Sequence, residues 1–225
     1  MGYHLPLSYG ETMAKTAILD YDAGNLTSVE RAVCRLGIDA VVTRDRATIR
    51  DAERLIFPGV GAARASMESL ERFGLAEEIR RAVAAGKPVL GICIGCQVAF
   101  SYSDEDGGVA CLDLLPGRVV RFQFPEGSEF KVPHMGWNAV RARLPHPILA
   151  GLNPPPGRPE PQFYFVHSYF VVPTDPSLVI GSCEYGGIEF PAVVGAGNLV
   201  AVQFHTEKSG RRGLTLLANF LRWRP

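Results

Sequence analysis

Short apolar runs alternate along the first half of the chain with stretches whose apolar residues recur every three or four positions. The runs predict strands at residues 16–21, 40–43, 54–57 and 88–93. The helical spacing predicts helices that begin at residue 25 and near residue 95, and over residues 62–73 and 75–85. Strands and helices that alternate through short turns form a parallel sheet covered on both faces, so the pattern predicts an α/β fold.

The second half of the chain has a different pattern, in which short β-branched runs are separated by turn residues. It predicts strands at residues 118–122, 137–141, 163–168, 178–183, 192–194 and 199–204, and a final helix over 210–223. Residues 151–161 are rich in proline and predict a surface loop. We therefore expect a central, mostly parallel sheet with helices on both faces and an antiparallel extension.

Composition narrows the class of protein. Lys plus Arg equals Asp plus Glu at 23 each, so no overall basic field indicates a nucleic-acid partner. No apolar run approaches the roughly 18 residues needed to span a membrane. The five cysteines are odd in number and scattered, which does not indicate a disulfide framework. With no secretory signal in residues 1–12, we expect a cytoplasmic protein.

The apolar pattern begins just after Met13. We interpret residues 1–12 as an extension outside the fold and residues 13–225 as a single domain. Which of Met1 and Met13 is the natural start is left open by the sequence.

Residues 91–95 read Gly-Ile-Cys-Ile-Gly, directly after an apolar strand and before a helix. This spacing is typical of the turn that presents a nucleophile, with Cys93 in the place of serine. Glycines on both sides allow the tight turn, and the start of a helix favours a thiolate. The amide of Ile94 would then face an oxyanion. A buried structural cysteine is the alternative.

Cys93 and Cys96 also form a C-x-x-C pair, which is compatible with a redox pair or with half of a zinc site. A zinc site would need a second pair of ligands at short spacing, and the chain has none. The redox alternative stays open, although Cys96 also suits a small apolar position inside the helix.

A thiolate mechanism needs a base, and His205 is the strongest candidate among five histidines. It ends an apolar strand, and Glu207 follows at a spacing that lets a carboxylate orient the imidazole. His134 and His167 are further candidates. A packing or capping role for His205 is the alternative.

Residues 58–61 read Pro-Gly-Val-Gly after the third predicted strand. Glycine lets the backbone turn there and aim an N–H group at a ligand, although the same residues suit an ordinary turn.

Taken together, these segments resemble the class I glutamine amidotransferases, and within them the glutaminase subunits of imidazole glycerol phosphate synthases. The resemblance covers residues 16–223. It rests on separate motifs in the right order, at residues 20–26, 58–61, 91–97, 131–138, 164–169 and 203–209. The cysteine and histidine motifs fit any member of the family, whereas Pro-His-Met-Gly-Trp-Asn and Phe-Val-His-Ser-Tyr point to these subunits.

The resemblance implies hydrolysis of L-glutamine through a Cys93 thioester, with His205 as general base and acid and Glu207 as orienting carboxylate. It implies an oxyanion hole from Ile94 and the Gly59–Val60 peptide, and no metal or cofactor. The glutamine would be held by Gly61, Gln97, Ser168 and Tyr169. The partner would be a (βα)8-barrel cyclase, which receives the ammonia and forms imidazole glycerol phosphate and an aminoimidazole carboxamide ribotide. The residues facing this cyclase would be Asn25, Trp137, Tyr164 and Lys208.

The sequence departs from the family in two positions. Thr206 stands where the family has proline; threonine loosens the turn but can hydrogen-bond locally, and we expect the triad to survive. Cys96 replaces a methionine. The remaining alternatives are the glutaminase subunit of another amidotransferase, a hydrolase with a cysteine turn of this kind, and a catalytically idle binding or regulatory homologue.

Overall fold

The computed structural model describes residues 16–225 except residues 153 and 156. The expected extension at residues 1–12 and a start at Met13 therefore lie outside the described residues. Within them, the main sheet has the strand order β2-β1-β3-β4-β14-β13-β12-β9. Its parallel strands are β2 (Ala40–Thr43), β1 (Thr16–Leu19), β3 (Arg54–Gly59), β4 (Val89–Cys93) and β14 (Leu199–Val202). Antiparallel strands extend it, namely β13 (Ile188–Ala196), β12 (Val179–Tyr185) and β9 (Arg141–Ala142).

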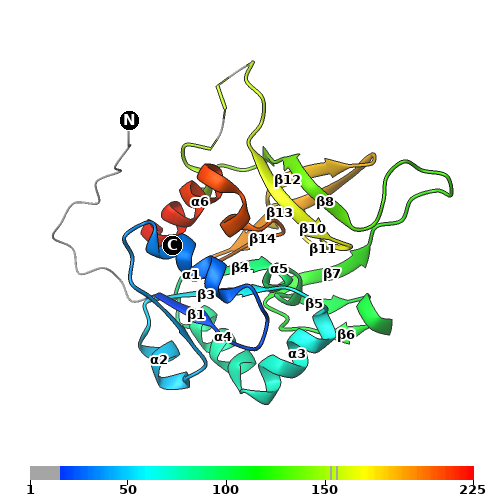
Figure 1. Ribbon diagram of the computed structural model, residues 1–225. Coiled ribbons are helices and arrows are strands. Elements are labelled where there is room, and N and C mark those ends of the chain that lie inside the picture. The colour runs from blue at the N-terminus through cyan, green and yellow to red at the C-terminus, as the bar shows by residue number, and fades with distance from the viewer. Residues whose placement is uncertain (1–15, 153, 156) are drawn as a thin grey trace.

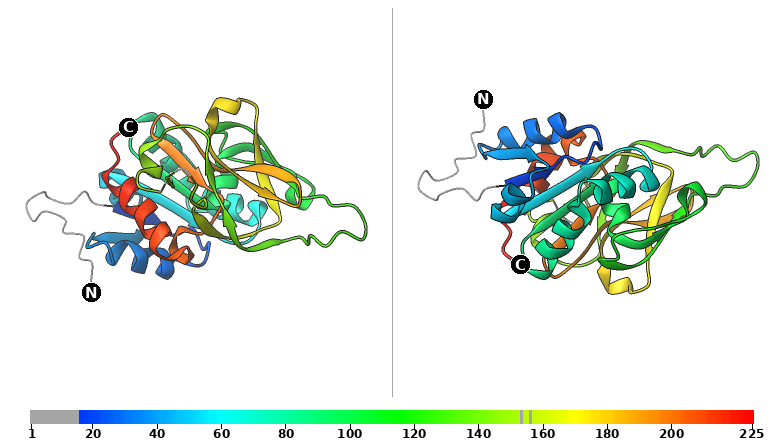
Figure 2. Two further views of the ribbon diagram at one scale, coloured as in Figure 1. Left: turned by 90° about the horizontal axis from the view of Figure 1, so that it is seen from above. Right: turned by 90° about the horizontal axis from the view of Figure 1, so that it is seen from below.

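Helices cover both faces of the parallel part of the sheet (Figures 1 and 2). One face carries α1 (Leu26–Cys34) and α6 (Gly210–Arg222), and the other carries α2 (Arg46–Asp51), α3 (Ala63–Arg72) and α4 (Leu75–Ala84). The expected α/β architecture is confirmed. None of the helices in the described part of the chain is long and apolar enough to cross a membrane.

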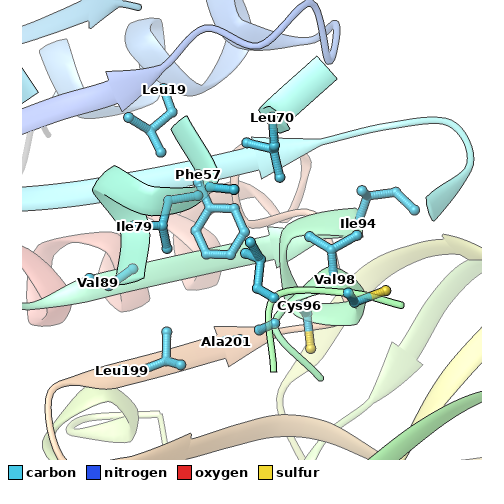
Figure 3. Close-up of a cluster of buried hydrophobic side chains, with 14 of the residues drawn as sticks. Leu19, Phe57, Leu70, Ile79, Val89, Ile94, Cys96, Val98, Leu199 and Ala201 are labelled. Atoms are coloured by element: carbon cyan, nitrogen blue, oxygen red, sulfur yellow. The ribbon is translucent and has the colours of Figure 1, made fainter. Parts of the chain in front are cut away.

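Successive strand residues alternate between two hydrophobic clusters, because side chains along a strand point to opposite faces. In β1, Leu19 packs into the cluster beneath α3 and α4, whereas Ile18 packs into the cluster beneath α1 and α6. Figure 3 shows Leu19, Phe57, Leu70 and Leu199 among the side chains of the first of these clusters. Both faces of β1, β3, β4 and β14 are buried, which explains their nearly continuous apolar runs.

Two smaller sheets lie beside the antiparallel part. One joins β11 (Tyr169–Pro173), β7 (Leu115–Arg121), β5 (Phe100–Ser103) and β6 (Val109–Ala110). The other pairs β8 (His134–Ala139) with β10 (Gln162–His167). The strand predicted at residues 137–141 is thus wrong in its bounds, since β8 begins earlier and β9 is separate. Strands β5, β6 and β11 and helix α2 were not predicted. The short 3-10 helices are η1 (Glu105–Gly107), η2 (Pro147–Leu149), η3 (Pro176–Leu178) and η4 (Thr206–Lys208).

Strands β4 and β14 are parallel neighbours, and their register decides which residues meet at the carboxyl edge of the sheet. Val202 lies opposite Ile92, one residue before Cys93. The segment that follows Val202, which includes His205, therefore leaves the sheet beside Cys93. Helix α5 (Ile94–Val98) begins directly after Cys93.

Candidate active site

Cys93 occupies a sharp turn between β4 and α5. Its backbone has φ 55° and ψ −104°, a positive-φ conformation that is unfavourable for a residue with a side chain and is concentrated at functional sites. A Cβ atom at Gly91 would lie 2.8 Å from the carbonyl oxygen of Gly95, and one at Gly95 would collide with the carbonyl of Phe57. Close backbone packing therefore requires both glycines, as their spacing predicts.

His205 lies beyond the end of β14 and begins the short helix η4. Its Nδ1 is 2.7 Å from Oε1 of Glu207. A carboxylate oxygen accepts, so Nδ1 carries a hydrogen, and in the neutral ring Nε2 is the acceptor. This buried Nε2 has no hydrogen-bond partner of ordinary geometry in the part of the chain that the structure describes. It is thus the nitrogen free to exchange a proton with a reacting group.

The surroundings of His205 favour its protonated form. Burial lowers the pKa of the ring, but the neighbouring Cys93 and Glu207 outweigh burial and raise the pKa to about 9. An imidazolium between a thiolate and a carboxylate is stabilised by both. The structure thus brings together the three residues that the sequence assigned as nucleophile, base and orienting carboxylate.

Ser209 holds the turn that carries His205. Its hydroxyl donates to the carbonyl of His205 over 2.5 Å and accepts from the backbone N–H of Tyr164 over 3.0 Å. The backbone N–H of His205 also donates to the carbonyl of Tyr164 over 2.9 Å. Thr206 does not use its capacity for a local hydrogen bond, because its buried hydroxyl has no partner among the described residues. Ser209 and Tyr164 instead supply the fixed geometry.

Asn25 reaches the same carboxylate from the opposite end of the chain. Its side-chain Nδ2 donates to Oε1 of Glu207 over 2.5 Å. Asn25 has φ 61°, a left-handed conformation that asparagine tolerates better than most residues. The sequence placed Asn25 at the start of a helix, and the resemblance implied that it faces the partner. Half-buried in this structure, it supports the orienting carboxylate.

The Gly59–Val60 peptide, expected to contribute to an oxyanion hole, lies at the end of β3. The backbone N–H of Val60 donates to the carbonyl of Ala23 over 3.0 Å, so in this conformation it is not free for another acceptor. A Cβ atom at Gly59 would collide with the hydroxyl of Tyr21. Ile94, the other expected contributor, is the first residue of α5 and is buried.

The residues expected to hold glutamine differ in their surroundings. Gln97 is buried, and its Nε2 donates to the carbonyl of Tyr169 over 2.9 Å and to Oε1 of Gln203 over 3.2 Å. Both Ser168, which lies between β10 and β11, and Tyr169, the first residue of β11, are half-buried. Gly61 is exposed, with φ 100°. Gln97 and Tyr169 are thus in direct contact, while Ser168 precedes Tyr169 in the chain.

Gln203 begins the motif at residues 203–209, but no functional role was predicted for it. It is fully buried, and its Nε2 lies 3.9 Å from Sγ of Cys93. Its position two residues before His205 could have indicated it, since a polar residue at a buried strand end is unusual. His134 and His167 form a buried pair joined over 3.0 Å between Nδ1 and Nε2.

Three of the expected partner-facing residues gather beside the turn of His205. The rings of Trp137 and Tyr164 meet edge to face, with centroids 6.0 Å apart. The ammonium of Lys208 lies 6.0 Å from the centroid of the Tyr164 ring. The side chain of Trp137 is 55% exposed, which is unusual for so large an apolar group.

The cysteine pair does not form a metal centre in this structure. No group of three or more His, Cys, Asp or Glu side chains among the described residues is arranged to hold a metal ion. Cys96 is buried within the hydrophobic cluster of Figure 3, and burial raises the pKa of its thiol. Cys96 therefore has the environment of a small apolar side chain.

Comparison with known proteins gives a consistent result for the family and the fold. The family model described as "Glutamine amidotransferase class-I" matches residues 17–223. The chain is 50% identical to "Imidazole glycerol phosphate synthase subunit HisH" of Nitratidesulfovibrio vulgaris (strain DP4), over 92% of this chain and 95% of the relative. It is also 50% identical to the protein of that name from Moorella thermoacetica, over 92% and 94%.

Solved structures share the architecture at much lower identity. One described as "Crystal structure of glutamine amidotransferase" has a TM-score of 0.69 and 20% identity, and covers 92% of this chain and 96% of its own. Another, "Structure of PurLQS from Thermotoga maritima", has a TM-score of 0.67 and 19% identity, over 93% and 98%. These two likenesses concern the fold alone.

Proposed function

The chain belongs to the class I glutamine amidotransferase family, and from this premise we propose that it is the glutaminase subunit of imidazole glycerol phosphate synthase in histidine biosynthesis. We take residues 13–225 as a single amidotransferase domain. The observation that carries the proposal is His205, which lies between a cysteine on a strained turn and a buried carboxylate. A subunit of this kind hydrolyses L-glutamine and supplies the ammonia to its partner.

The first half-reaction begins with a thiolate. The sulfur of Cys93 attacks the side-chain amide carbon of glutamine, a C–S bond forms, and the carbonyl oxygen becomes an oxyanion. Nε2 of the His205 imidazolium then gives its proton to the departing nitrogen, the C–N bond breaks, and ammonia leaves. Glu207, hydrogen-bonded to Nδ1 over 2.7 Å, keeps the ring oriented throughout.

The second half-reaction removes the γ-glutamyl group. Nε2 of His205, now neutral, takes a proton from water, and the hydroxide attacks the thioester carbon. The C–S bond breaks, glutamate leaves, and the thiolate–imidazolium pair is restored. The role of the thiol is to divide the hydrolysis of one amide into two acyl transfers. This half of the synthase needs no metal or organic cofactor.

We propose that the oxyanion is held by the backbone N–H of Ile94 and by one N–H of the Gly59–Val60 peptide. In this structure the N–H of Val60 is hydrogen-bonded to Ala23, so the peptide has to turn before its N–H can face the oxyanion. We propose that this turn controls glutaminase activity. The isolated chain would then be a poor glutaminase. Binding of the partner with its ligand would turn this peptide and activate the enzyme.

The partner in this proposal is a (βα)8-barrel cyclase that docks over Trp137, Tyr164, Lys208 and the exposed edge of Asn25. The support is the exposed indole of Trp137 beside the turn that carries His205. Ammonia would pass through the barrel to its acceptor, without entering the solvent. Gly61, Gln97, Ser168 and Tyr169 would hold the glutamine.

Ammonia release from glutamine, measured with and without the cyclase, tests this proposal. We expect slow release by the chain alone and a large increase once the cyclase and its ligand are present. Rapid turnover by the chain alone would contradict the proposed control by the Gly59–Val60 peptide. No release under either condition would contradict the enzyme and favour an idle regulatory homologue.

A further inference from the structure

A chain of buried polar groups leads from Cys93 to strand β8. Its members are the side chains of Gln203 and Gln97, the carbonyl oxygen of Tyr169, and the side chains of His167, His134 and Asn138. Both glutamines and both histidines are at most 5% exposed. Polar groups buried this deeply have to satisfy one another, so the direction of each hydrogen bond is constrained.

The carbonyl oxygen of Tyr169 fixes the direction toward Cys93, because a carbonyl can only accept. The nitrogen of the Gln97 amide must therefore face it, over 2.9 Å. The second hydrogen of this nitrogen points to the amide of Gln203, whose oxygen lies 3.2 Å away. Once that oxygen faces Gln97, the NH2 group of Gln203 is left to face the sulfur of Cys93.

The same carbonyl fixes the direction toward β8. Nδ1 of His167 lies 2.8 Å from it and must donate, which leaves Nε2 of His167 as the acceptor for Nδ1–H of His134 over 3.0 Å. Nε2 of His134 then accepts from Asn138 over 3.3 Å. Burial lowers the pKa of His134 to about 4 and that of His167 to about 3, so both rings are neutral at pH 7.

Besides this series of hydrogen-bonded groups, three titratable groups act on the sulfur of Cys93. Burial raises the pKa of Tyr21 and of Cys96, so both are neutral and neither offers a positive charge to the thiolate. His205 supplies the positive charge. A fixed N–H donor has a distinct effect, because it favours the thiolate without taking part in the proton exchange.

We propose that the side-chain amide of Gln203 donates a hydrogen bond to the Cys93 thiolate, and that Gln97 and the Tyr169 carbonyl hold the amide in this orientation. The inference rests on the proposed function, in which Cys93 is the nucleophile. Gln203 is then a catalytic residue that contacts the reacting sulfur, and Gln97 is a positioning residue behind it.

The test is the rate at which iodoacetamide alkylates Cys93 across pH, followed peptide by peptide with mass spectrometry on the full chain. Cys34 is the exposed internal reference, since Cys96, Cys111 and Cys183 are buried. The variants are Gln203→Met, which removes the donor, and Gln203→Glu, which keeps the shape and replaces the donor by a carboxyl group. Gln162→Met, on the exposed end of β10, is the matched control.

For Gln203→Met we expect alkylation of Cys93 at pH 7 to slow about tenfold, with the midpoint of the profile about one unit higher. For Gln203→Glu we expect a larger loss, and for Gln162→Met none. The near-isosteric glutamate variant decides the matter if the methionine variant does not fold. The inference would be overturned if both Gln203 variants showed the wild-type alkylation profile at Cys93. It would also be overturned if Cys93 reacted in none of the chains.

The alkylation rate requires neither glutamine nor the cyclase. If the wild-type chain releases no ammonia with its partner but the Gln203 variants still slow alkylation, the proposed function fails and the hydrogen bond stands. If ammonia is released normally and alkylation does not depend on Gln203, only the inference fails.

Discussion

Asn25 donates a hydrogen bond to Oε1 of Glu207, the same carboxylate oxygen that accepts from Nδ1 of His205. A residue of the loop between β1 and α1 therefore shares one acceptor atom with the imidazole. The carboxylate can orient His205 well only while its own position is fixed, and Asn25 is the neighbour that fixes it from the other side.

Replacement of Asn25 should weaken turnover without removing a reacting group. Asn25→Gly keeps the left-handed backbone and deletes the donor, so we expect kcat to fall about tenfold at every pH. Asn25→Asp brings a carboxyl group against Glu207, and we expect a larger loss at pH 8 that partly recovers toward pH 6. Steady-state glutamine hydrolysis by the complex across this range is the measurement. Unchanged kcat in both variants would contradict the role.

Gly59 and Tyr21 form a second testable pair. The Cβ of a Gly59→Ala variant would collide with the Tyr21 hydroxyl, which has no hydrogen bond of ordinary geometry among the described residues. We expect Gly59→Ala to lower Tm and glutaminase activity, and Tyr21→Phe alone to change the free energy of unfolding by less than about 1 kcal/mol. Thermal denaturation of the double variant checks the contact, because removal of the hydroxyl should restore part of the loss. Additive effects would contradict it.

The raised pKa of His205 predicts a titration. In the wild-type chain the ring should titrate near pH 9, and in Cys93→Ala the midpoint should fall, because the neighbouring sulfur no longer favours the imidazolium. Since the folded pKa is raised, the associated stability is fully present below pH 6.5 and is lost as the pH rises through about 9. The NMR shift of the His205 Cε1 proton across pH measures both midpoints. Equal midpoints would contradict the pairing with Cys93.

Glu78 gives a prediction that concerns stability alone. Its buried carboxylate is paired with Arg50 over 2.6 Å and with Arg46 over 2.8 Å. These partners outweigh burial and lower the pKa of Glu78 to about 2. Because this folded pKa is depressed, the stability it brings is present above about pH 4.5 and is lost as the pH falls through about 2.

We expect Glu78→Gln to reduce the free energy of unfolding by about 2 kcal/mol at pH 7, since two guanidinium groups lose their partner. Urea denaturation at pH 7 and at pH 3 should show this difference shrinking at the lower pH. A difference of the same size at both values would mean that the ion pairs do not stabilise the fold.

Much of the fold and the central part of the candidate site could be predicted from local sequence. The glycines around Cys93 indicate a tight turn because only backbone fits there. His205 and Glu207 are close neighbours in the sequence, so their spacing by itself indicates that the carboxylate can orient the imidazole. Strand β5, by contrast, follows the short helix α5 after one residue, and its Phe-Ser-Tyr-Ser sequence has no strong apolar pattern of its own.

Contacts between distant segments could not be predicted in the same way. Asn25 and Glu207 are 182 residues apart, and Gln203 and Cys93 are 110 apart. Their meeting depends on the parallel pairing of β14 with β4 and on the path of the β1–α1 loop, which the sequence alone does not specify. Within the described part of the chain the hydroxyl of Thr206 has no hydrogen-bond partner, and Ser209 and Tyr164 hold the turn instead.

The central claim is that Cys93 makes ammonia for a reaction completed in another chain. The most direct measurement compares the Cys93→Ala complex with wild type in synthesis of imidazole glycerol phosphate, once with glutamine and once with ammonium salt. We predict that the variant loses synthesis from glutamine and retains the wild-type rate from ammonium. Continued synthesis from glutamine by the variant would contradict the account.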